Sequence, residues 1–63
     1  GKNCFIGPNA VITRGVKVGN NCFVGPNSVL TFNIPDLTAV SGNPAKIIGK
    51  VNLDKDKVSI TKK

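Results

Sequence analysis

The stretch NCFVGPNSVLT, residues 21–31, nearly duplicates an earlier stretch of the same chain. Residues 3–13 read NCFIGPNAVIT, so the two stretches differ at only three positions. A repeat of this length predicts structural units that stack on one another, because one such unit cannot bury its apolar face alone. The duplication therefore decides the fold class.

A shorter period of six residues occurs within the longer repeat that relates residues 3–13 to residues 21–31. Aliphatic side chains recur every six residues, and a small or medium side chain follows each of them four positions later. The first set is Ile6, Ile12, Val18, Val24 and Leu30, and the second is Ala10, Val16, Cys22, Ser28 and Ile34. Gly and Asn fill the turns between them because they adopt left-handed backbone angles at low cost. We expect short strands joined by tight turns, three to a coil, with both sets pointing inward and coils about 4.8 Å apart.

The rhythm changes after Leu30. Pro35 removes a backbone donor and restricts the residue before it to extended geometry, which interrupts the repeat. The sequence TAVSG then predicts one more strand, and Pro44 and Gly49 mark a closure. Weak alternation of apolar residues beyond position 50 favours an edge strand or a strand pair. We therefore divide the chain into coils over residues 1–49 and a basic tail over residues 50–63.

Composition narrows the class of protein. The chain has 63 residues and a formal net charge of +6, with nine Lys and Arg, three acids and no His. So short a chain buries only about 60% of its unfolded surface. With two Cys and no His, repetition and oligomerisation are better sources of stability than disulfides or a metal site.

The same composition argues against several partners. The basic tail contains no aromatic residue, which disfavours nucleic-acid binding, and no apolar run approaches the roughly 18 residues of a membrane span. A cytoplasmic protein with reduced thiols is expected, because no signal peptide is evident. The chain begins at Gly1 inside a repeat and without an initiator Met, which predicts a fragment, a processed product or a truncated chain.

The hexads IGPNAV, VGNNCF and VGPNSV, followed by NIPDLTAVSGNPAKIIGK, resemble the C-terminal segment of a hexapeptide-repeat acyltransferase. Serine O-acetyltransferases and galactoside or maltose O-acetyltransferases are the nearest comparisons, and the resemblance covers residues 1–50. It implies an all-β fold, a left-handed parallel β-helix of about two to three coils with a C-terminal closure. It also implies a homotrimer and acetyl-CoA as co-substrate.

The resemblance implies a surface for coenzyme A along the outside of the last coils. Its members bind the pantetheine arm there and meet the phosphates with basic groups near the closure. Carried over by position, the implied cofactor-binding residues are Gly25, Pro26, Thr31, Phe32, Lys46 and Lys50. Pro8 is the equivalent of Pro26 one coil earlier. Phe32 stands where a Lys is common in the family, which replaces a charge with an apolar surface.

Catalysis in this family resembles general-base chemistry by a His, and this chain has none. We therefore expect no catalytic residue here, no metal ligand, and no activity from this segment alone. The small-molecule acceptor would be bound by upstream coils. The complete enzyme would be an acetyl-CoA-dependent O- or N-acetyltransferase. The alternative is a non-catalytic β-helix scaffold for trimerisation or a decayed acyltransferase, and the related β-helix carbonic anhydrases gain no support without His ligands.

Two pairs of side chains in the repeats call for separate interpretation. Cys4 and Cys22 occupy equivalent inward positions, which favours packing in the core over a disulfide or a nucleophile. Phe5 and Phe23 follow them and should point outward and stack. Aromatic side chains exposed on one face suit a subunit interface. Arg14 and Lys17 flank a turn at Gly15 and are expected to be surface charges, and the Asn residues are expected in turns.

Overall fold

The computed structural model describes residues 1–53 and 58–62, and in this part of the chain the secondary structure is all β. Three strands of one sheet are parallel neighbours: β1 (Phe5–Ile6), β3 (Phe23–Val24) and β5 (Thr38–Ser41). A second sheet pairs β2 (Val11–Ile12) with β4 (Val29–Leu30), again in parallel. Two antiparallel strands extend the first sheet: β6 (Lys46–Leu53) and β7 (Val58–Lys62).

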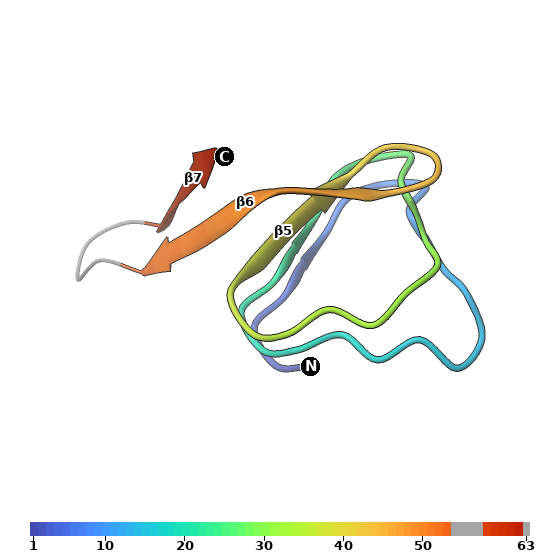
Figure 1. Ribbon diagram of the computed structural model, residues 1–63, viewed down its shortest axis with the longest axis horizontal. Coiled ribbons are helices and arrows are strands. Elements are labelled where there is room, and N and C mark those ends of the chain that lie inside the picture. The colour runs from blue at the N-terminus through green and yellow to red at the C-terminus, as the bar shows by residue number, and fades with distance from the viewer. Residues whose placement is uncertain (54–57, 63) are drawn as a thin grey trace.

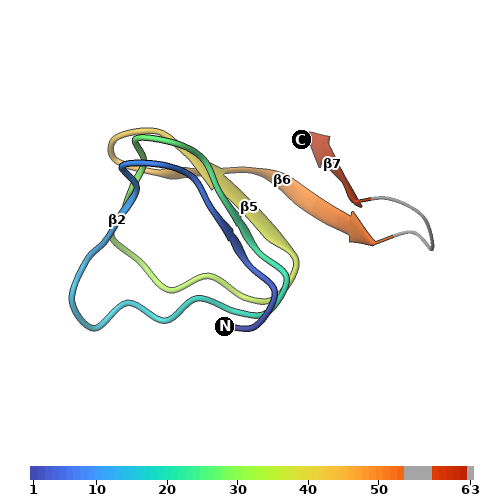
Figure 2. The ribbon, with the colours of Figure 1, turned by 180° about the vertical axis from the view of Figure 1, so that it is seen from behind.

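The chain winds around a roughly triangular path, and each turn of the path lies against the one before it (Figure 1, Figure 2). Phe5 pairs with Phe23, and Val11 pairs with Val29, so the longer period of the sequence is the spacing between stacked turns. We call residues 1–18 repeat 1, residues 19–34 repeat 2 and residues 35–45 repeat 3. The parallel sheets agree with the stacking that the sequence predicts and are consistent with a β-helix.

The second repeat is two residues shorter than the first. Val18 pairs with Ile34 and Val24 with Val40, so these partners are closer in sequence than Phe5 and Phe23 are. The expectation that Ile34 occupies the place of Val16 is therefore wrong. Between equivalent strands, repeat 2 rounds its corner with residues 31–34, whereas repeat 1 uses residues 13–18. Gly15, with φ of 85°, belongs to the longer corner.

The core follows the six-residue period. Both inward sets of the sequence analysis supply it, with Val24, Leu30 and Ser28 having no exposed surface. The buried apolar cluster is Cys22, Val24, Leu30, Ile34, Val40 and Ala45, with Cys4, Ala10, Val16 and Val18 packed against it. Burial of these side chains supplies the main driving force for stacking.

Repeat 1 is less covered than repeat 2. Ile6 and Ile12 are 43% and 39% exposed, although they occupy the places of Val24 and Leu30. The described structure has no strand on the far side of β1 or β2. We call this side of repeat 1 the open end.

Asn residues form the corners, as predicted. Asn3, Asn9, Asn21 and Asn27 all have φ between 56° and 62°, the left-handed region that Asn tolerates better than most residues. Leu37 takes the place of Asn21 in repeat 3 and has φ of 60°. A bulky aliphatic residue at this angle is strained, because its Cβ crowds the following carbonyl.

Side-chain acceptors connect the repeats at two corners. The Lys2 N–H donates to Asn20 Oδ1 at 2.9 Å, and the Asn20 N–H donates to Asp36 Oδ1 at 2.7 Å. The Lys17 N–H donates to Asn33 Oδ1 at 2.8 Å. Within the described residues, no buried side-chain nitrogen or oxygen lacks a partner. The corners therefore satisfy their polar groups while the strands stack.

The chain reverses direction after Ser41. Gly42, with φ of 109°, lies in the turn, and β6 then runs antiparallel to β5 with a register shift near Ile48. The predicted strand after the proline and the predicted strand pair near the C-terminus are confirmed as β5 and as β6 with β7. β6 continues through residues 49 and 50 and projects with β7 away from the triangular body (Figure 1).

Part of the predicted basic tail lies outside the described residues, namely 54–57 and 63. None of the described segments forms a helix with the length and hydropathy needed to cross a membrane.

Candidate functional site

The residues expected to bind coenzyme A gather mainly where β4 ends and β6 begins. The Ala45 N–H donates to Val29 O at 2.8 Å, which fixes the start of β6 beside β4. Ala45 is buried in the core, so the next side chain, Lys46, turns outward and is exposed. Thr31 follows β4 and is also exposed. This contact places Lys46 next to a residue that pairs with the start of β4, and Thr31 follows the end of that strand.

Phe32 and Pro26 add apolar surface to repeat 2. Phe32 is 37% exposed at the shortened corner, next to Thr31. Pro26 is exposed at the turn that precedes β4. As expected for Pro, its carbonyl can accept a hydrogen bond but its nitrogen cannot donate one.

Gly25 lies where repeats 2 and 3 pack closely against each other. It is buried, and a Cβ at this residue would lie 2.6 Å from Ser41 Oγ in repeat 3. The Gly25 N–H donates to Val40 O at 2.9 Å. Glycine is required here for the close approach of two repeats, and no free space for a ligand adjoins its α-carbon on that side.

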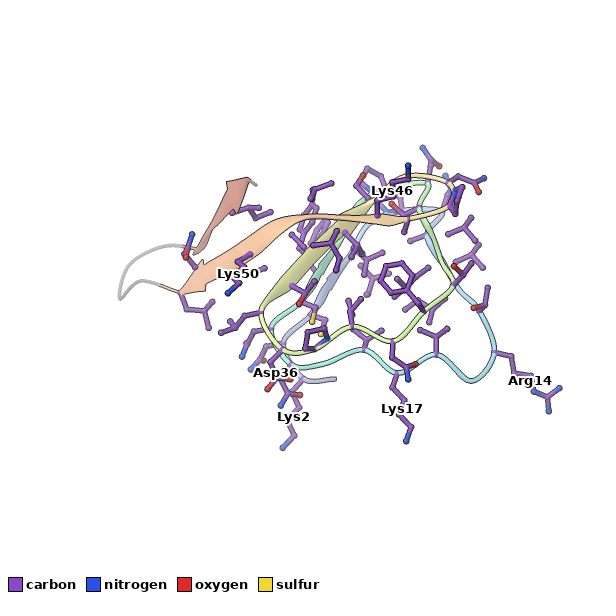
Figure 3. All side chains as sticks on the ribbon, viewed as in Figure 1. Lys2, Arg14, Lys17, Asp36, Lys46 and Lys50 are labelled. Carbon is purple, nitrogen blue, oxygen red and sulfur yellow. The ribbon has the colours of Figure 1, made fainter. Side chains whose placement is uncertain are left out.

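Lys46 and Lys50 are not brought together. Lys46 pairs with Ser41 and Lys50 with Thr38, and Ser41 and Thr38 belong to opposite faces of β5. The extra residue of β6 near Ile48 therefore places the two ammonium groups on opposite faces of the strand. Figure 3 shows them well separated along β6.

The other labelled cations lie on a different side of the molecule. Lys2, Lys17 and Arg14 are exposed and follow the edge opposite Lys46 (Figure 3). Asp36 is the only acid among the described residues, and it accepts the Asn20 N–H. The described surface is therefore predominantly basic, which favours anionic ligands.

The outer face of the first sheet carries an apolar hollow that the sequence analysis did not identify as a site. The rings of Phe5 and Phe23 stack at 5.1 Å with an angle of 8° between their planes, as predicted. Val51, Leu53 and Ile60 of the β6–β7 hairpin form the facing wall, and Asn3 and Asn21 also line the hollow, whose volume is about 530 Å³. The alternation of apolar residues beyond position 50 was the available signal for this wall.

The two thiols are free. Cys22 is buried, and Cys4 is half-buried toward the open end. Burial raises the pKa of the Cys22 thiol, so its thiolate is disfavoured. The position of Cys22 in the core and of Cys4 against it agrees with packing.

The described residues include no evident general base for acyl transfer. The sequence has no His, and the carboxylate of Asp36 already accepts a hydrogen bond at a corner. No group of three or more potential metal-ligating side chains occurs among the described residues. Thr31, Phe32 and Lys46 are exposed and offer a hydroxyl group, an aromatic ring and an ammonium group.

Comparison with known proteins identifies the repeat. Residues 1–31 match the family model described as bacterial transferase hexapeptide (six repeats). Residues 1–31 are therefore hexapeptide repeats of this family. No curated protein matches the chain in sequence.

Two solved structures resemble this hexapeptide-repeat chain. One is the serine acetyltransferase of Neisseria gonorrhoeae, with a TM-score of 0.77, 34% identity and 79% of this chain covered. The other is a maltose O-acetyltransferase from Clostridium difficile 630, with a TM-score of 0.75, 38% identity and 82% covered. The chain spans only 19% and 29% of those two proteins. The chain thus resembles a small part of each of these two acetyltransferases.

Proposed function

We propose that the chain is the C-terminal part of an acetyl-CoA-dependent O- or N-acetyltransferase and supplies part of its coenzyme A surface. Its repeats would be the last coils of a left-handed parallel β-helix. The exposed apolar side chains Ile6 and Ile12 at the open end support this, because they match residues that are fully buried one repeat later. A further coil on that end would bury them and would supply the missing His and the acceptor contacts.

The observation that carries the proposal is the link between the segment that bears Lys46 and the strand that precedes Thr31 and Phe32. All three side chains are exposed, and the hydrogen bond from Ala45 N–H to Val29 O connects the two segments that bear them. A lysine ammonium suits a phosphate as a point charge, and an aromatic ring suits a nucleotide base. Pro26 adds a carbonyl acceptor for the pantetheine arm. Gly25 and Lys50 fit less well, because Ser41 occupies the space beside the Gly25 α-carbon and Lys50 lies on the other face of β6.

Titration calorimetry of the full chain with coenzyme A tests this function. We expect Lys46→Ala to weaken binding about tenfold, because a charge-assisted contact contributes roughly 1.5–3 kcal/mol. Lys17→Ala is the matched control and should bind as the parent does. Absence of binding at millimolar coenzyme A, or equal losses in the two variants, would contradict the proposal.

A second function is favoured by the apolar outer face: assembly of three copies of this chain. Phe5 and Leu53 are 54% and 52% exposed on the two walls of the hollow. An exposed apolar surface of this kind is typical of a protein–protein interface. The full protein would be a homotrimer, and the non-catalytic alternative is a trimerisation scaffold without catalysis. The free thiols fit a cytoplasmic location.

Sedimentation equilibrium distinguishes the two functions. A trimer mass that falls to a monomer mass in Phe5→Ser supports the interface, and Arg14→Ser is a control on another side of the molecule. A trimer that binds no coenzyme A supports the scaffold. A monomer at all concentrations up to the millimolar range contradicts assembly by this segment.

A further inference from the structure

Cys4 and Cys22 stand opposite each other on stacked repeats. The parallel register that pairs Phe5 with Phe23 places the two preceding residues side by side as well. Both thiols are free and belong to the inner face of the repeats. Their backbones are thus one strand spacing apart, about 4.8 Å.

The two side chains adopt the same conformation, because each thiol has the same pair of contacts. The Cys4 Sγ lies 3.1 Å from Gly19 O and 3.6 Å from Lys2 O. The Cys22 Sγ has its equivalents at the same distances: 3.1 Å to Pro35 O and 3.6 Å to Asn20 O. The two side chains have the same conformation, and their backbones are displaced by one strand spacing. The two sulfur atoms are therefore also roughly 4.8 Å apart.

We propose that Cys4 and Cys22 bind one soft, two-coordinate cation of the Cu(I) and Ag(I) class between repeats 1 and 2. A zinc–thiolate bond is about 2.3 Å long, and two collinear metal–sulfur bonds of about this length span about 4.6 Å. This span matches the spacing of the sulfur atoms without a change of rotamer. A disulfide needs the sulfur atoms about 2.05 Å apart, so both thiols would have to leave their present conformation.

The ligand set selects the class of cation. Thiolate ligands prefer Cu(I) and other soft ions, whereas zinc usually takes four ligands. The described residues provide no group of three or more His, Cys, Asp or Glu side chains, so a four-ligand site is not formed there. Binding is an exchange of protons for the metal: two thiols release two protons, two sulfur–metal bonds form, and no electron is transferred. The bis-thiolate complex of a monovalent ion carries one negative charge in a chain of formal charge +6.

Silver nitrate in chloride-free buffer is the probe, and native mass spectrometry of the full chain is the primary measurement. We expect one Ag(I) per chain with loss of two protons. The melting temperature should rise, because the paired site exists only in the folded state. Cys4→Ser and Cys22→Ser should each lower the affinity at least 100-fold, and Lys17→Ala should leave it unchanged. Circular dichroism checks the fold of each variant. Should Cys22→Ser fail to fold, the silver affinity of Cys4→Ser alone tests the proposal.

Several results would overturn the site. These are two Ag(I) ions bound independently to one chain, a fall in melting temperature on addition of silver, or retention of affinity in Cys4→Ser. Formation of a Cys4–Cys22 disulfide in place of the silver complex, seen as a loss of two mass units without metal, would also overturn it. The site does not depend on coenzyme A binding, so its failure leaves the proposed function untouched.

Discussion

Repeats 1 and 2 are nearly the same sequence in two different environments. Val24 and Leu30 of repeat 2 have no exposed surface, whereas Ile6 and Ile12 of repeat 1 keep 43% and 39% of theirs. The difference arises because repeat 2 has a neighbour on each side and repeat 1 has one. In a stacked architecture the neighbours therefore decide how much a given side chain contributes to stability, because each repeat contacts only the adjacent ones.

The largest predicted difference in stability is between substitutions at equivalent residues of repeats 1 and 2. Leu30→Ala should lower the free energy of unfolding by about 3–5 kcal/mol, since it leaves a cavity in a fully buried position. Ile12→Ala should cost about 1 kcal/mol, because much of that side chain already contacts solvent. Urea unfolding followed by circular dichroism measures both, with trimethylamine N-oxide added if Leu30→Ala is unfolded in buffer. Equal costs in the two variants would show that repeat 1 is covered in solution.

Glycines at two corners should respond differently to the same substitution. A Cβ on Gly7 would lie 2.5 Å from the backbone nitrogen of Pro26, so Gly7→Ala should cost about 3 kcal/mol by forcing repeats 1 and 2 apart. A Cβ on Gly15 would meet nothing within 4 Å, and only its φ of 85° opposes the substitution. Gly15→Ala should therefore cost about 1 kcal/mol. Thermal unfolding of both variants checks the order, and the reverse order would refute this account of the corners.

The strained corner of repeat 3 offers a stabilising substitution. Leu37 has the left-handed φ that Asn21 has one repeat earlier, and it is 38% exposed. Leu37→Asn should raise the free energy of unfolding by about 1 kcal/mol, because Asn adopts this conformation more readily. Leu37→Ala keeps a Cβ at the same angle and is the control, for which no gain is expected. A gain of equal size in both variants would show that removal of the leucine side chain, and not the backbone preference of Asn, causes the stabilisation.

The smallest effect concerns the pH dependence of stability and arises at Cys22. Burial raises the pKa of the Cys22 thiol, so the folded chain holds this proton more tightly than the unfolded chain. The resulting stability is complete below the ordinary cysteine pKa of about 8.5 and is lost as the pH rises through the raised value. Unfolding measured between pH 7.5 and 10.5 should show a steeper loss for the parent than for Cys22→Ser. Identical slopes would contradict the assignment.

Much of the fold could be predicted from the sequence because the repeats impose it. The six-residue period gives the inward positions, the longer period gives the register of Phe5 on Phe23, and the Asn residues give the corners. The loss of two residues in repeat 2 could not be predicted, because the identity of Thr13 with Thr31 continues the old register up to the point of change. The pairings of Val18 with Ile34 and of Val24 with Val40 reveal it.

The candidate site was less predictable than the fold. Lys46 and Thr31 are each assigned from their positions in the motif, and their role in binding stays a prediction. The sequence does not show that Lys50 and Lys46 lie on opposite faces of β6. A regular strand would put both side chains on one face, and the extra residue near Ile48 moves them to opposite faces. The hollow depends on how β6 and β7 turn beside the stacked Phe rings, a tertiary relation that local sequence does not encode.

The corner that differs between repeats 1 and 2 is a natural point of insertion. Parallel pairing holds on both sides of it, at Ile12 with Leu30 and at Val18 with Ile34, although one corner has two residues more than the other. Changes of length there are absorbed without disturbing the strands that follow. A binding loop or an affinity tag placed next to Gly15 should therefore be carried on the surface while the stack keeps its register.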